Sequence, residues 1–396
     1  MPLSSIRVLD LSRVLAGPYC TMLLADLGAH VVKLERPGVG DETRHWGPPE
    51  AGGEAAYFLA VNRSKRSCAV DLGTPDGRAI ARALALGSDV VIENFRAGTA
   101  KRLGLGYEQL RAENPGLVYC SITGFGADRE PPDRPGYDFV VQAESGLMAI
   151  TGDPEGEPMK TGVAVVDVLA GTHAAVGILG ALVGRASTGQ GARLEVPLLD
   201  AALASLVNVA SSALVTGEEA RRFGNAHASI VPYQAFRAAD GWIAVAAAND
   251  GLFRRLCDAL GRPDLAADPR FATNPERVRN RAALVAVLES AFAQRSSDDW
   301  LRTLDEAGVP AGKVRGVLEA IRGAAELGRP ATTTVEHPTA GSLELVDSPL
   351  RFEVGLRAPQ APPLLGEHTA AVLGELGYGE AEIGELERRG VVATAG

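Results

Sequence analysis

Short runs of Val, Ile and Leu alternate with helical stretches through the first two hundred residues of this 396-residue chain. This alternation is typical of a parallel sheet with helices on its faces. Between the first two runs, "GPYCTMLLADLGA" predicts a helix with Pro18 in its first turn and Gly28 at its end. The pattern therefore predicts an α/β fold with a Rossmann-like domain. We expect strands at residues 6–12, 30–35, 89–95, 117–123 and 192–198.

The pattern changes after residue 200 and predicts a second, smaller domain. A helix in "DAALASLVNVASSALVTG" is followed by an irregular segment, a strand in "ADGWIAVAAAN" and further helices. Residues 326–396 contain strands in "SLELVDSPLRFE" and a helix in "APPLLGEHTAAVLGELG", and these elements need another surface to pack against. We expect residues 1–225 to form the first part of a large Rossmann-like domain, 226–325 a small α/β domain, and 326–396 a return to the large domain.

The charge and the cysteines exclude several classes of protein. A formal net charge of −10 argues against nucleic acid or an anionic membrane surface as partner, because both need a cationic excess. The N-terminal residues lack a signal-peptide pattern, and glycines interrupt every apolar run that approaches about 20 residues. The four cysteines are widely spaced, without a C-x-x-C pair. We expect a soluble, cytoplasmic protein with reduced thiols, no membrane span and no metal site.

One carboxylate stands in the apolar run "MKTGVAVVDVLAGTHAAVGILGALVGR" at residues 159–185. Between Lys160 and Arg185, only Asp167 carries a full charge at neutral pH. Asp167 caps a helix, marks a turn from a strand at 163–166 into a helix at 168–184, or carries chemistry. The three interpretations are compatible, because open α/β sheets place their chemistry at such junctions.

Basic residues follow the expected strands. Because the carboxyl ends of parallel strands converge on one crevice, these residues are candidates for binding a phosphorylated ligand; the alternative is a solvated surface. A nicotinamide dinucleotide fits poorly, because the first turn reads "SRVLAGP" without G-x-G-x-x-G, although Glu35 ends the second strand. The basic residues are Arg36, Arg44, Arg63, Lys65, Arg66, Arg96, Lys101 and Arg102.

An ordered set of segments resembles the family III CoA-transferases, which include formyl-CoA transferase, carnitine CoA-transferase and α-methylacyl-CoA racemase. The resemblance implies a Rossmann-like large domain made from both chain ends, a smaller domain between them, and an interlocked homodimer. It also implies acyl-CoA and a small carboxylic acid as substrates. The segments are "LDLSRVLAGPYCTMLLADLGAHVVKLERPGVGDETR", "NRSKRSCAVDLGTPDGR", "DVVIENFRAGTAKRLGLGYEQL", "NPGLVYCSITGFG", "VAVVDVLAGTHAAVGILGAL" and "APPLLGEHT".

The resemblance implies that Asp167 is the nucleophile, forming a mixed anhydride with the acyl group and then an aspartyl-CoA thioester. An apolar neighbourhood raises the pKa of a carboxyl, so we expect the helix N-terminus to keep Asp167 ionised. Small residues after Asp167, such as Gly171, allow a thioester or another backbone to approach. The implied CoA contacts are Val14, Leu15, Ala16, Arg36, Val70, Asp71, Leu72, Gly73, Asn94, Phe95, Arg96, Arg102, Tyr137 and Asp138.

Two departures from the family's patterns bear on the reaction. Tyr137 in "PGYDFVVQ" occupies the position of the racemase histidine, and an ordinary tyrosine with a pKa near 10 is a poor base at neutral pH. This departure disfavours racemisation. Racemisation or isomerisation of an acyl-CoA, with Asp167 as general base, is the alternative to CoA transfer. In addition, Leu15 stands near the position of a formyl-CoA transferase glutamine, and "RRFGNAHASIVPYQ" replaces that enzyme's glycine-rich lid.

The segment "GNAHASIVPYQAFRAADG" resembles the branch of the family that moves CoA between dicarboxylates with succinyl-CoA as donor. The resemblance implies that Gly224, Asn225 and His227 contact the substrate, with Arg221 or Arg222 helping to hold its distal carboxylate. His227 alternatively caps a loop. His173, in the helix after Asp167, is expected to be a packed core histidine.

Overall fold

The computed structural model describes residues 1–129, 134–353, 355–356 and 358–395, and it divides into two compact units. Unit 1 comprises Met1–Leu147, Thr161–Leu214 and Gly328–Gly396, and unit 2 comprises Met148–Lys160 and Val215–Leu327. The longer segment of unit 2, Val215–Leu327, contains the small domain expected at residues 226–325. Unit 2 also includes Met148–Lys160, which no sequence feature assigned to it.

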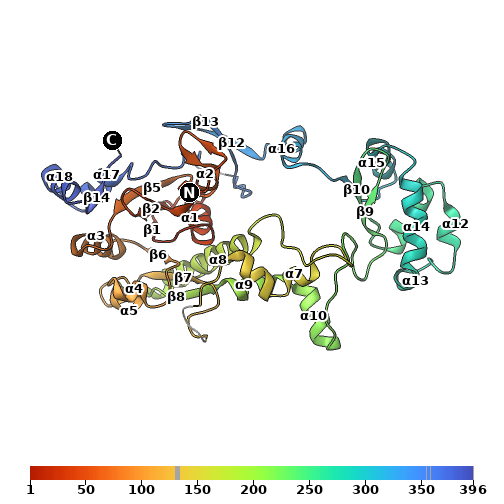
Figure 1. The fold of residues 1–396 in the computed structure, drawn as a ribbon, viewed down its shortest axis with the longest axis horizontal. Coiled ribbons are helices and arrows are strands. Elements are labelled where there is room, and N and C mark those ends of the chain that lie inside the picture. The colour runs from red at the N-terminus through yellow and green to blue at the C-terminus, as the bar shows by residue number, and fades with distance from the viewer. Residues whose placement is uncertain (130–133, 354, 357, 396) are drawn as a thin grey trace. The chain divides into compact units, whose positions relative to one another are not determined.

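A seven-stranded sheet forms the centre of unit 1 (Figure 1). Its order is β14-β5-β2-β1-β6-β7-β8, and β14 alone runs antiparallel to its neighbour. Numbered along the chain, the six parallel strands follow the Rossmann order 3-2-1-4-5-6, which reverses between β1 and β6. The strands are β1 Arg7–Asp10, β2 His30–Glu35, β5 Lys65–Val70, β6 Val90–Glu93, β7 Val118–Thr123, β8 Arg193–Pro197 and β14 Val392–Ala393.

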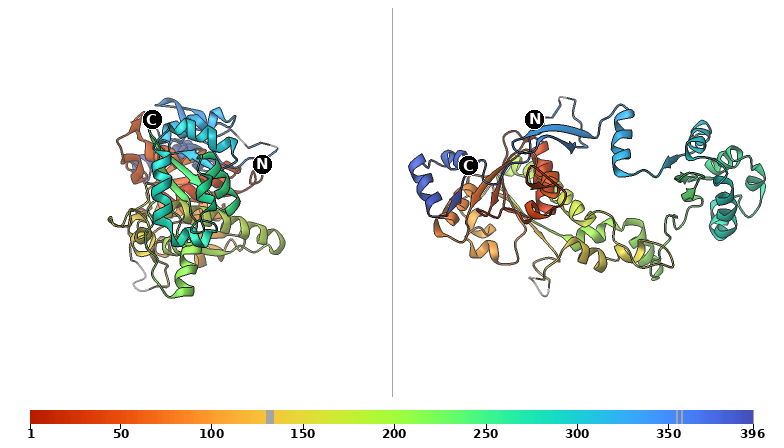
Figure 2. Two further views of the ribbon diagram at one scale, coloured as in Figure 1. Left: turned by 90° about the vertical axis from the view of Figure 1, so that its right-hand side faces the viewer. Right: turned by 45° about the horizontal axis from the view of Figure 1, so that its top comes forward.

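Helices cover both faces of this sheet because alternate strand residues point to opposite sides. Val8 and Val31 lie in a core with helices α1 (Ala16–Asp26) and α8 (Val165–Thr188). Leu9 and Val91 lie in a second core on the other face, with Ile80 of α3. Helices on that face are α3 Pro75–Leu86, α5 Tyr107–Arg111, α17 Thr369–Glu375 and α18 Glu380–Arg388 (Figure 2).

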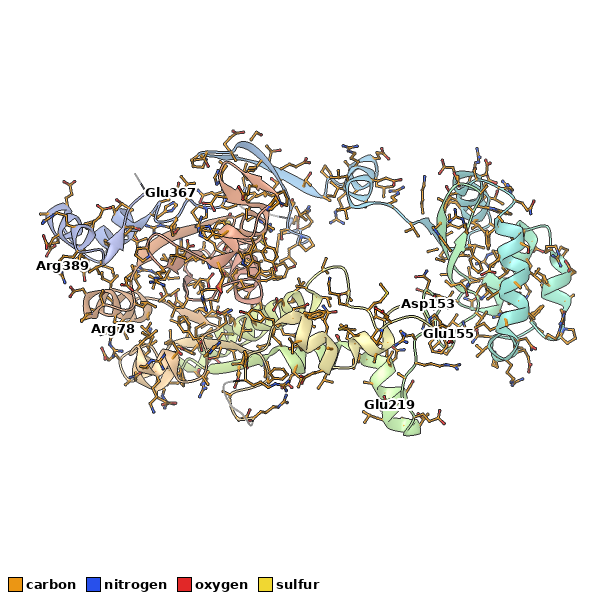
Figure 3. The ribbon with its side chains drawn as sticks, in the orientation of Figure 1. Arg78, Asp153, Glu155, Glu219, Glu367 and Arg389 are labelled. Carbon is orange, nitrogen blue, oxygen red and sulfur yellow. The ribbon has the colours of Figure 1, made fainter. Side chains whose placement is uncertain are left out.

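The C-terminal residues complete unit 1. Strand β14 pairs with β5 through Val392 opposite Val70. Arg389, labelled in Figure 3, forms an ion pair with Asp76 of α3. Strand β5 was not expected from the sequence, because its first residues, Lys65 and Arg66, hide its apolar pattern. The remaining elements of unit 1, or on its border, are η1 Glu42–His45, β3 Glu50–Ala51, β4 Glu54–Ala55, α2 Ala56–Val61, α4 Thr99–Arg102, α6 Asp138–Glu144, α7 Leu147–Ile150, α9 Leu198–Ser205, α10 Val207–Thr216, β12 Thr332–His337 and β13 Gly341–Val346.

Unit 2 has its own core, built on a three-stranded antiparallel sheet of order β11-β10-β9. Phe236 of β9 packs on Phe292, with ring centroids 4.8 Å apart, and Phe292 meets the Trp300 ring edge-on. Aromatic burial of this kind stabilises a small domain independently of its neighbour. The elements are β9 Tyr233–Arg237, β10 Trp242–Ala246, β11 Ala311–Lys313, α11 Asp250–Ala259, α12 Pro263–Ala267, α13 Asn274–Arg279, α14 Arg281–Phe292, α15 Ser297–Glu306 and α16 Val317–Glu326.

Helix α8 differs from its expectation in two respects. The expected strand at 163–166 is wrong, because Val165 and Val166 already belong to the helix, which continues to Thr188. Its glycines do not interrupt it, and among the described residues this helix is long and apolar enough to cross a membrane on composition alone. Val166, Ala170, Ala174 and Ile178 are nevertheless buried in the core of unit 1, which is the usual place of such a helix in a globular domain.

Candidate functional site

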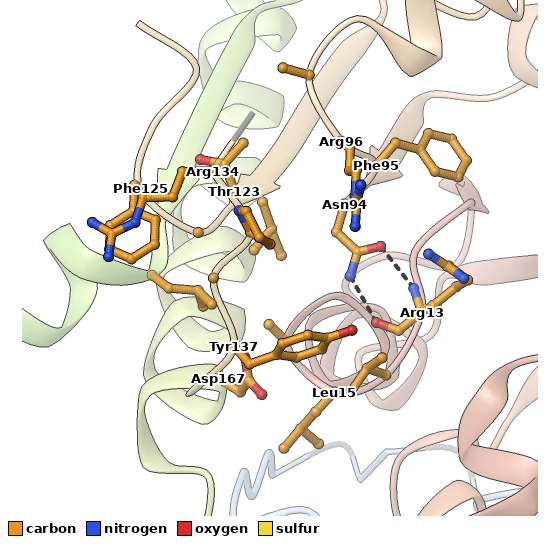
Figure 4. Close-up of a pocket in the computed structure, with 18 of the residues that line it drawn as sticks. Arg13, Leu15, Asn94, Phe95, Arg96, Thr123, Phe125, Arg134, Tyr137 and Asp167 are labelled. Atoms are coloured by element: carbon orange, nitrogen blue, oxygen red, sulfur yellow. Dashed lines mark hydrogen bonds between the residues drawn. The ribbon is translucent and has the colours of Figure 1, made fainter. Parts of the chain in front are cut away.

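A groove lies at the carboxyl ends of the parallel strands of unit 1, where the strand order reverses (Figure 4). Open α/β sheets bind ligands at this point, because the loops of adjacent strands diverge there. The turn after β1, the loops after β6 and β7, and the start of α8 all contribute residues. The groove is lined among others by Arg13, Val14, Leu15, Ala16, Asn94, Phe95, Arg96, Thr123, Phe125, Arg134, Tyr137 and Asp167.

A second pocket shares Arg13, Glu42 and Phe95 with this groove and extends it toward β2 and β5. Between them, the two pockets contain twelve of the fifteen residues expected to contact CoA or react with it; the exceptions are Gly73, Arg102 and Asp138. Gly73 follows Asp71 in the same turn, and Arg102 donates to Thr99 Oγ1 at 3.2 Å. The second pocket's expected residues are Arg36, Val70, Asp71, Leu72 and Phe95.

Asp167 stands in the first turn of α8, but it does not cap the helix. The residue before the helix, Ala164, makes no side-chain cap. Instead, Asp138 of α6 accepts hydrogen bonds through Oδ1 from the backbone N–H groups of Val166 (2.8 Å) and Asp167 (3.4 Å). A carboxylate from another helix therefore satisfies the free donors at this terminus. The carboxyl group of Asp167 remains available to the groove.

Asp138 is bound by the protein on both carboxylate oxygens. It is buried, and its Oδ2 accepts from Gln142 Nε2 at 2.6 Å. Gln142 in turn accepts through Oε1 from the backbone N–H of Thr161 at 2.9 Å. Asp138 thus joins α6 to the start of α8, and its expected contact with CoA stays a prediction.

The ionisation of Asp167 is opposite to the expectation. Burial, and after it the negative charge of Asp138, raise the pKa of the Asp167 carboxyl to about 7. The helix terminus does not offset these effects, because its N–H groups are bound to Asp138. At neutral pH the free site therefore holds a mixture of the carboxylate and the carboxylic acid.

Tyr57 is a residue with a pKa shift to which Asp167 contributes, and the sequence did not indicate it. Burial raises the pKa of its hydroxyl to about 12, and the negative charges of Asp167, Asp138 and Asp41 add to this shift. The phenol of α2 therefore lies within electrostatic reach of the Asp167 carboxyl. Trp46 packs on Tyr57 with ring centroids 5.1 Å apart. The run "GEAAYFLA" carries no recognisable signal, because only the fold brings α2 toward α8.

Buried charges hold the turn between β1 and α1, where a dinucleotide-binding fold uses glycines. Val14 has a φ of +72°, and its N–H points at the Asp41 carboxylate, 3.3 Å from each oxygen. Lys33 pairs with Asp41 at 2.9 Å and donates to the carbonyl of Ser12 at 2.8 Å. On the other side, Asn94 accepts from the backbone N–H of Arg13 and donates to its carbonyl (Figure 4). The turn is therefore fixed from two directions.

Helix α1 starts beside Asp167 without a capping side chain or an acid in its first turn. Leu15 and Ala16 line the same groove as Asp167, and the positive end of the helix dipole is directed there. Gly171 of α8 makes this close packing possible. A Cβ at Gly171 would lie 2.5 Å from the Ala16 carbonyl oxygen, which is well inside van der Waals contact.

Several of the basic residues after the strands form ion pairs within the protein. Arg44 pairs with the buried Glu35 and the half-buried Glu54, and the buried residues Arg63 and Lys65 pair with Asp26 and Asp10. Arg66 pairs with Glu375 near the surface. Arg36 and Arg96 are exposed, line the pockets, and form no ion pair with any described residue. These two remain candidates for binding phosphate.

The expected substrate residues Gly224, Asn225 and His227 lie in unit 2, whereas Asp167 lies in unit 1. His227 accepts through Nδ1 from the backbone N–H of Ser229 at 3.1 Å, so its ring proton is on Nε2. His173 is exposed on α8 and not packed in the core as expected. Within the described ranges, no cluster of three or more His, Cys, Asp or Glu could hold a metal ion.

Comparisons with known proteins agree with this geometry. A family model described as CoA-transferase family III matches residues 3–369. The succinyl-CoA:glutarate CoA-transferase of Homo sapiens is 42% identical over 393 residues, which cover 99% of this chain and 90% of that protein. The succinate–glutarate CoA-transferase of Agrobacterium fabrum is 43% identical over 382 residues, 95% of this chain and 96% of that protein. The crystal structure of a CaiB/BaiF family protein from Brucella suis gives a TM-score of 0.85 at 43% identity, covering 95% of this chain and 99% of that one. These matches show that this chain is a CoA-transferase and belongs to CoA-transferase family III.

Proposed function

We propose that this enzyme transfers CoA from succinyl-CoA to a small dicarboxylic acid through covalent intermediates on Asp167. The observation that carries the proposal is the position of Asp167: its carboxyl group does not cap the helix, and it lies in the groove that contains half of the expected CoA contacts. The relatives from Homo sapiens and Agrobacterium fabrum are both named for CoA transfer between succinate and glutarate, which supports the choice of substrates.

The two adjoining pockets suit the extended shape of an acyl-CoA. Arg36 lines the second pocket and Arg96 the first, and Phe95 lies in both. Guanidinium groups bind phosphate through charge-assisted hydrogen bonds, and an aromatic ring stacks on adenine or packs against pantetheine. The thioester end then lies toward Asp167.

The first half of the reaction opens the donor thioester. An oxygen of the ionised Asp167 carboxylate bonds to the thioester carbonyl carbon, the C–S bond breaks, and its electron pair leaves with sulfur as the CoA thiolate. The thiolate then bonds to the γ-carbonyl carbon of Asp167, and the anhydride C–O bond breaks to release succinate. The product is an aspartyl-CoA thioester, and no proton is gained or lost.

The second half repeats these steps in reverse with the acceptor. The acceptor carboxylate attacks the aspartyl-CoA carbonyl and expels the thiolate, which then attacks the acceptor carbonyl and frees Asp167. Each tetrahedral intermediate places negative charge on a former carbonyl oxygen. The uncapped N–H groups at the start of α1, at Leu15 and Ala16, are suited to stabilise that charge. Burial around Asp167 limits hydrolysis by water.

Intact-protein mass spectrometry after brief incubation with succinyl-CoA tests the covalent mechanism. We expect a mass increase from a succinyl or CoA adduct, which hydroxylamine converts to a hydroxamate that peptide mapping locates at Asp167. Asp167→Asn is the matched control and is expected to form no adduct while still binding CoA. Turnover of succinyl-CoA and glutarate by Asp167→Asn at the wild-type rate would refute the proposal.

Acyl-CoA racemisation is the second candidate, because a carboxyl with its pKa raised to about 7 also suits a general base. The two functions differ in their need for an acceptor. A racemase exchanges the α-proton of an acyl-CoA with deuterated solvent when no acceptor acid is present, whereas the transferase mechanism exchanges none. Deuterium incorporation without acceptor, detected by mass spectrometry, would favour the racemase.

We further propose that the enzyme acts as an interlocked homodimer in the cytoplasm, with Gly224, Asn225 and His227 contacting the acceptor. Exposed apolar side chains on α8 support self-association: Val176 and Val183 are 63% and 74% exposed. Light scattering during size-exclusion chromatography measures the oligomeric state directly. A monomer across the micromolar range would contradict the dimer.

A further inference from the structure

Arg13 lies where the two pockets of unit 1 meet. The groove at the strand ends and the second pocket share three residues, Arg13, Glu42 and Phe95. A ligand that occupies both pockets therefore passes these side chains. Arg13 comes from the turn after β1, and Glu42 is the first residue of η1, which follows β2. No sequence pattern indicated Arg13 or Glu42 as a ligand contact.

The backbone of Arg13 is fixed, whereas its side chain is not. The N–H of Arg13 donates to Asn94 Oδ1 at 3.0 Å, and its carbonyl accepts from Asn94 Nδ2 at 2.8 Å (Figure 4). The side chain is 53% exposed, and in the described part of the chain it has one ion-pair partner, Glu42, at 3.1 Å. The guanidinium can therefore change its partner without moving the turn that lines the groove.

Glu42 differs from its neighbour Asp41 in how its charge is neutralised. Asp41 also lines the second pocket, but it pairs with the fully buried Lys33 at 2.9 Å. The carboxylate of Glu42 is 35% exposed, and Arg13 is its partner among the described residues. A partly exposed ion pair contributes little stability, because water screens the two charges. The pair of Arg13 and Glu42 is therefore easily exchanged for a stronger interaction.

We propose that Arg13 exchanges Glu42 for the diphosphate of CoA, so that Glu42 competes with the ligand for one guanidinium. A diphosphate has more negative charge and more acceptor oxygens than a carboxylate, and guanidinium groups bind phosphate through charge-assisted hydrogen bonds. The diphosphate is the middle part of CoA, between the adenosine and the pantetheine, and Arg13 lines both pockets. The inference rests on the proposed placement of acyl-CoA in these pockets.

The competition gives the two residues opposite effects on affinity. Without the Arg13 guanidinium, CoA loses a phosphate contact and binds more weakly. Without the Glu42 charge, Arg13 is unpaired in the empty site and a repulsive charge is removed, so CoA binds more tightly. Differences in affinity among variants of one site lie mainly in the dissociation rate. Glu42 therefore promotes release of the acyl-CoA product.

Calorimetric titration with free CoA compares Arg13→Gln, Glu42→Gln and the double variant. Free CoA is the probe because it carries the phosphates but no acyl carboxylate. We expect CoA to bind about tenfold more weakly to Arg13→Gln and about threefold more tightly to Glu42→Gln. In the Arg13→Gln background, we expect Glu42→Gln to change the Kd by less than about twofold. Equal tightening with and without Arg13, or no tightening at all, would overturn the inference.

Glu375→Gln is the matched control for the change in net charge. Glu375 forms a partly exposed pair with Arg66, and neither residue lines the two pockets. We expect the Kd of CoA in this variant to stay within about twofold of the wild-type value, because the charge is screened at a distance. Tightening equal to that of Glu42→Gln would assign the effect to net charge and overturn the inference.

Two further titrations identify the phosphate and separate the inference from the proposed function. We expect Arg13→Gln to lose the same factor of affinity for CoA and for 3′-dephospho-CoA; a loss confined to CoA would assign Arg13 to the 3′-phosphate and overturn the inference. If neither Arg13→Gln nor Arg36→Gln weakens CoA binding, the proposed placement of CoA fails. If Arg36→Gln weakens it and Arg13→Gln does not, the inference alone fails.

Discussion

Asp138 caps the helix that carries Asp167: its Oδ1 accepts from the backbone N–H of Asp167 at 3.4 Å and from that of Val166 at 2.8 Å. The same carboxylate that positions Asp167 also raises its pKa through like charge. Positioning and ionisation of the reactive group are therefore coupled through one residue. Asparagine in place of Asp138 separates the two effects, because it keeps the accepting oxygen and removes the charge.

We predict that Asp138→Asn shifts the pH dependence of transfer to lower pH. The nucleophile must be ionised, so activity of the wild type falls as pH drops through the Asp167 pKa of about 7. Asp138 from α6 is the charged group that raises the pKa of Asp167, and this variant removes its charge while the burial of Asp167 is kept. The measurement is kcat/KM between pH 5 and 9.

The control for that experiment is Asp138→Ala, which removes the accepting oxygen as well as the charge. We expect it to lower kcat and to cost about 1–2 kcal/mol of stability, the usual loss on removing a helix cap. An acid limb at the same pH in wild type and Asp138→Asn would show that Asp138 acts only as a structural cap.

We predict that Asp167→Asn abolishes transfer and stabilises the fold above pH 7. The folded pKa of about 7 lies above the unfolded value near 3.9, so the folded protein holds a proton between these values that the unfolded chain lacks. Wild-type stability therefore decreases as pH rises through this window. Asparagine does not titrate, so the free energy of unfolding of Asp167→Asn does not lose this contribution. The difference in unfolding free energy between the variant and the wild type therefore grows from pH 4 to 7 and amounts to at most a few kcal/mol. Urea unfolding at pH 4.5 and pH 8 measures it; an equal difference at both would contradict the prediction.

We predict that Lys33→Met is strongly destabilising. Lys33 and Asp41 form a fully buried pair at 2.9 Å, and removing one partner leaves an unpaired buried charge at a cost of about 3–5 kcal/mol. Arg66→Gln, which breaks the partly exposed pair with Glu375, is the control and is expected to cost less than about 1 kcal/mol. Equal midpoints of denaturant unfolding for the two variants would contradict this account.

We predict that Arg36→Gln weakens CoA binding about tenfold, since a charge-assisted hydrogen bond contributes about 1.5–3 kcal/mol. Arg36 lines the second pocket, whereas Arg102 is exposed outside both pockets and bonds to Thr99. Arg102→Gln is therefore expected to bind CoA as the wild type does. Calorimetry at two salt concentrations measures the CoA affinity of both variants. A tenfold loss of affinity in Arg102→Gln would show that Arg102 belongs to the CoA site.

We predict that Gly171→Ala impairs the chemistry more than CoA binding. A Cβ at this position lies 2.5 Å from the Ala16 carbonyl, so the start of α1 must move away from α8. Such an overpacked contact costs about 1–3 kcal/mol of stability. Gly180→Ala, on an open part of the same helix, is the control. A lower kcat with unchanged Kd for CoA is expected only for Gly171→Ala.

The sequence predicted the elements that depend on local apolar patterns and missed those that depend on tertiary contacts. The strands at β1, β2, β6, β7 and β8 are apolar runs, and all five are present. Strand β5 begins with charged residues whose partners, such as Asp10, come from a different strand. The run Val163–Val166 was interpreted as a strand because β-branched residues favour strands, yet Asp138 supplies a helix start there.

The candidate site likewise contains residues that the strand pattern predicts and residues that depend on tertiary contacts. The groove residues after β1 and β6 follow from the rule that parallel strands converge at their carboxyl ends. Which arginines face a ligand does not follow, because Arg44 and Arg63 are buried against acids of other elements, Glu35 of β2 and Asp26 of α1. Tyr57 did not follow from the sequence either. Its pKa shift arises from burial and from acidic residues that only the folded chain brings near it.

Strand β14 changes which backbone forms the edge of the sheet. The backbone N–H of Ala69 in β5 donates to Thr369 Oγ1, and Val70 pairs with Val392, so residues distant in sequence cover part of β5. An unpaired edge strand is a template for strand addition by other chains, and a very short edge strand is a poor one. The two-residue β14 therefore replaces the six-residue β5 as the edge and protects the folded unit against aggregation.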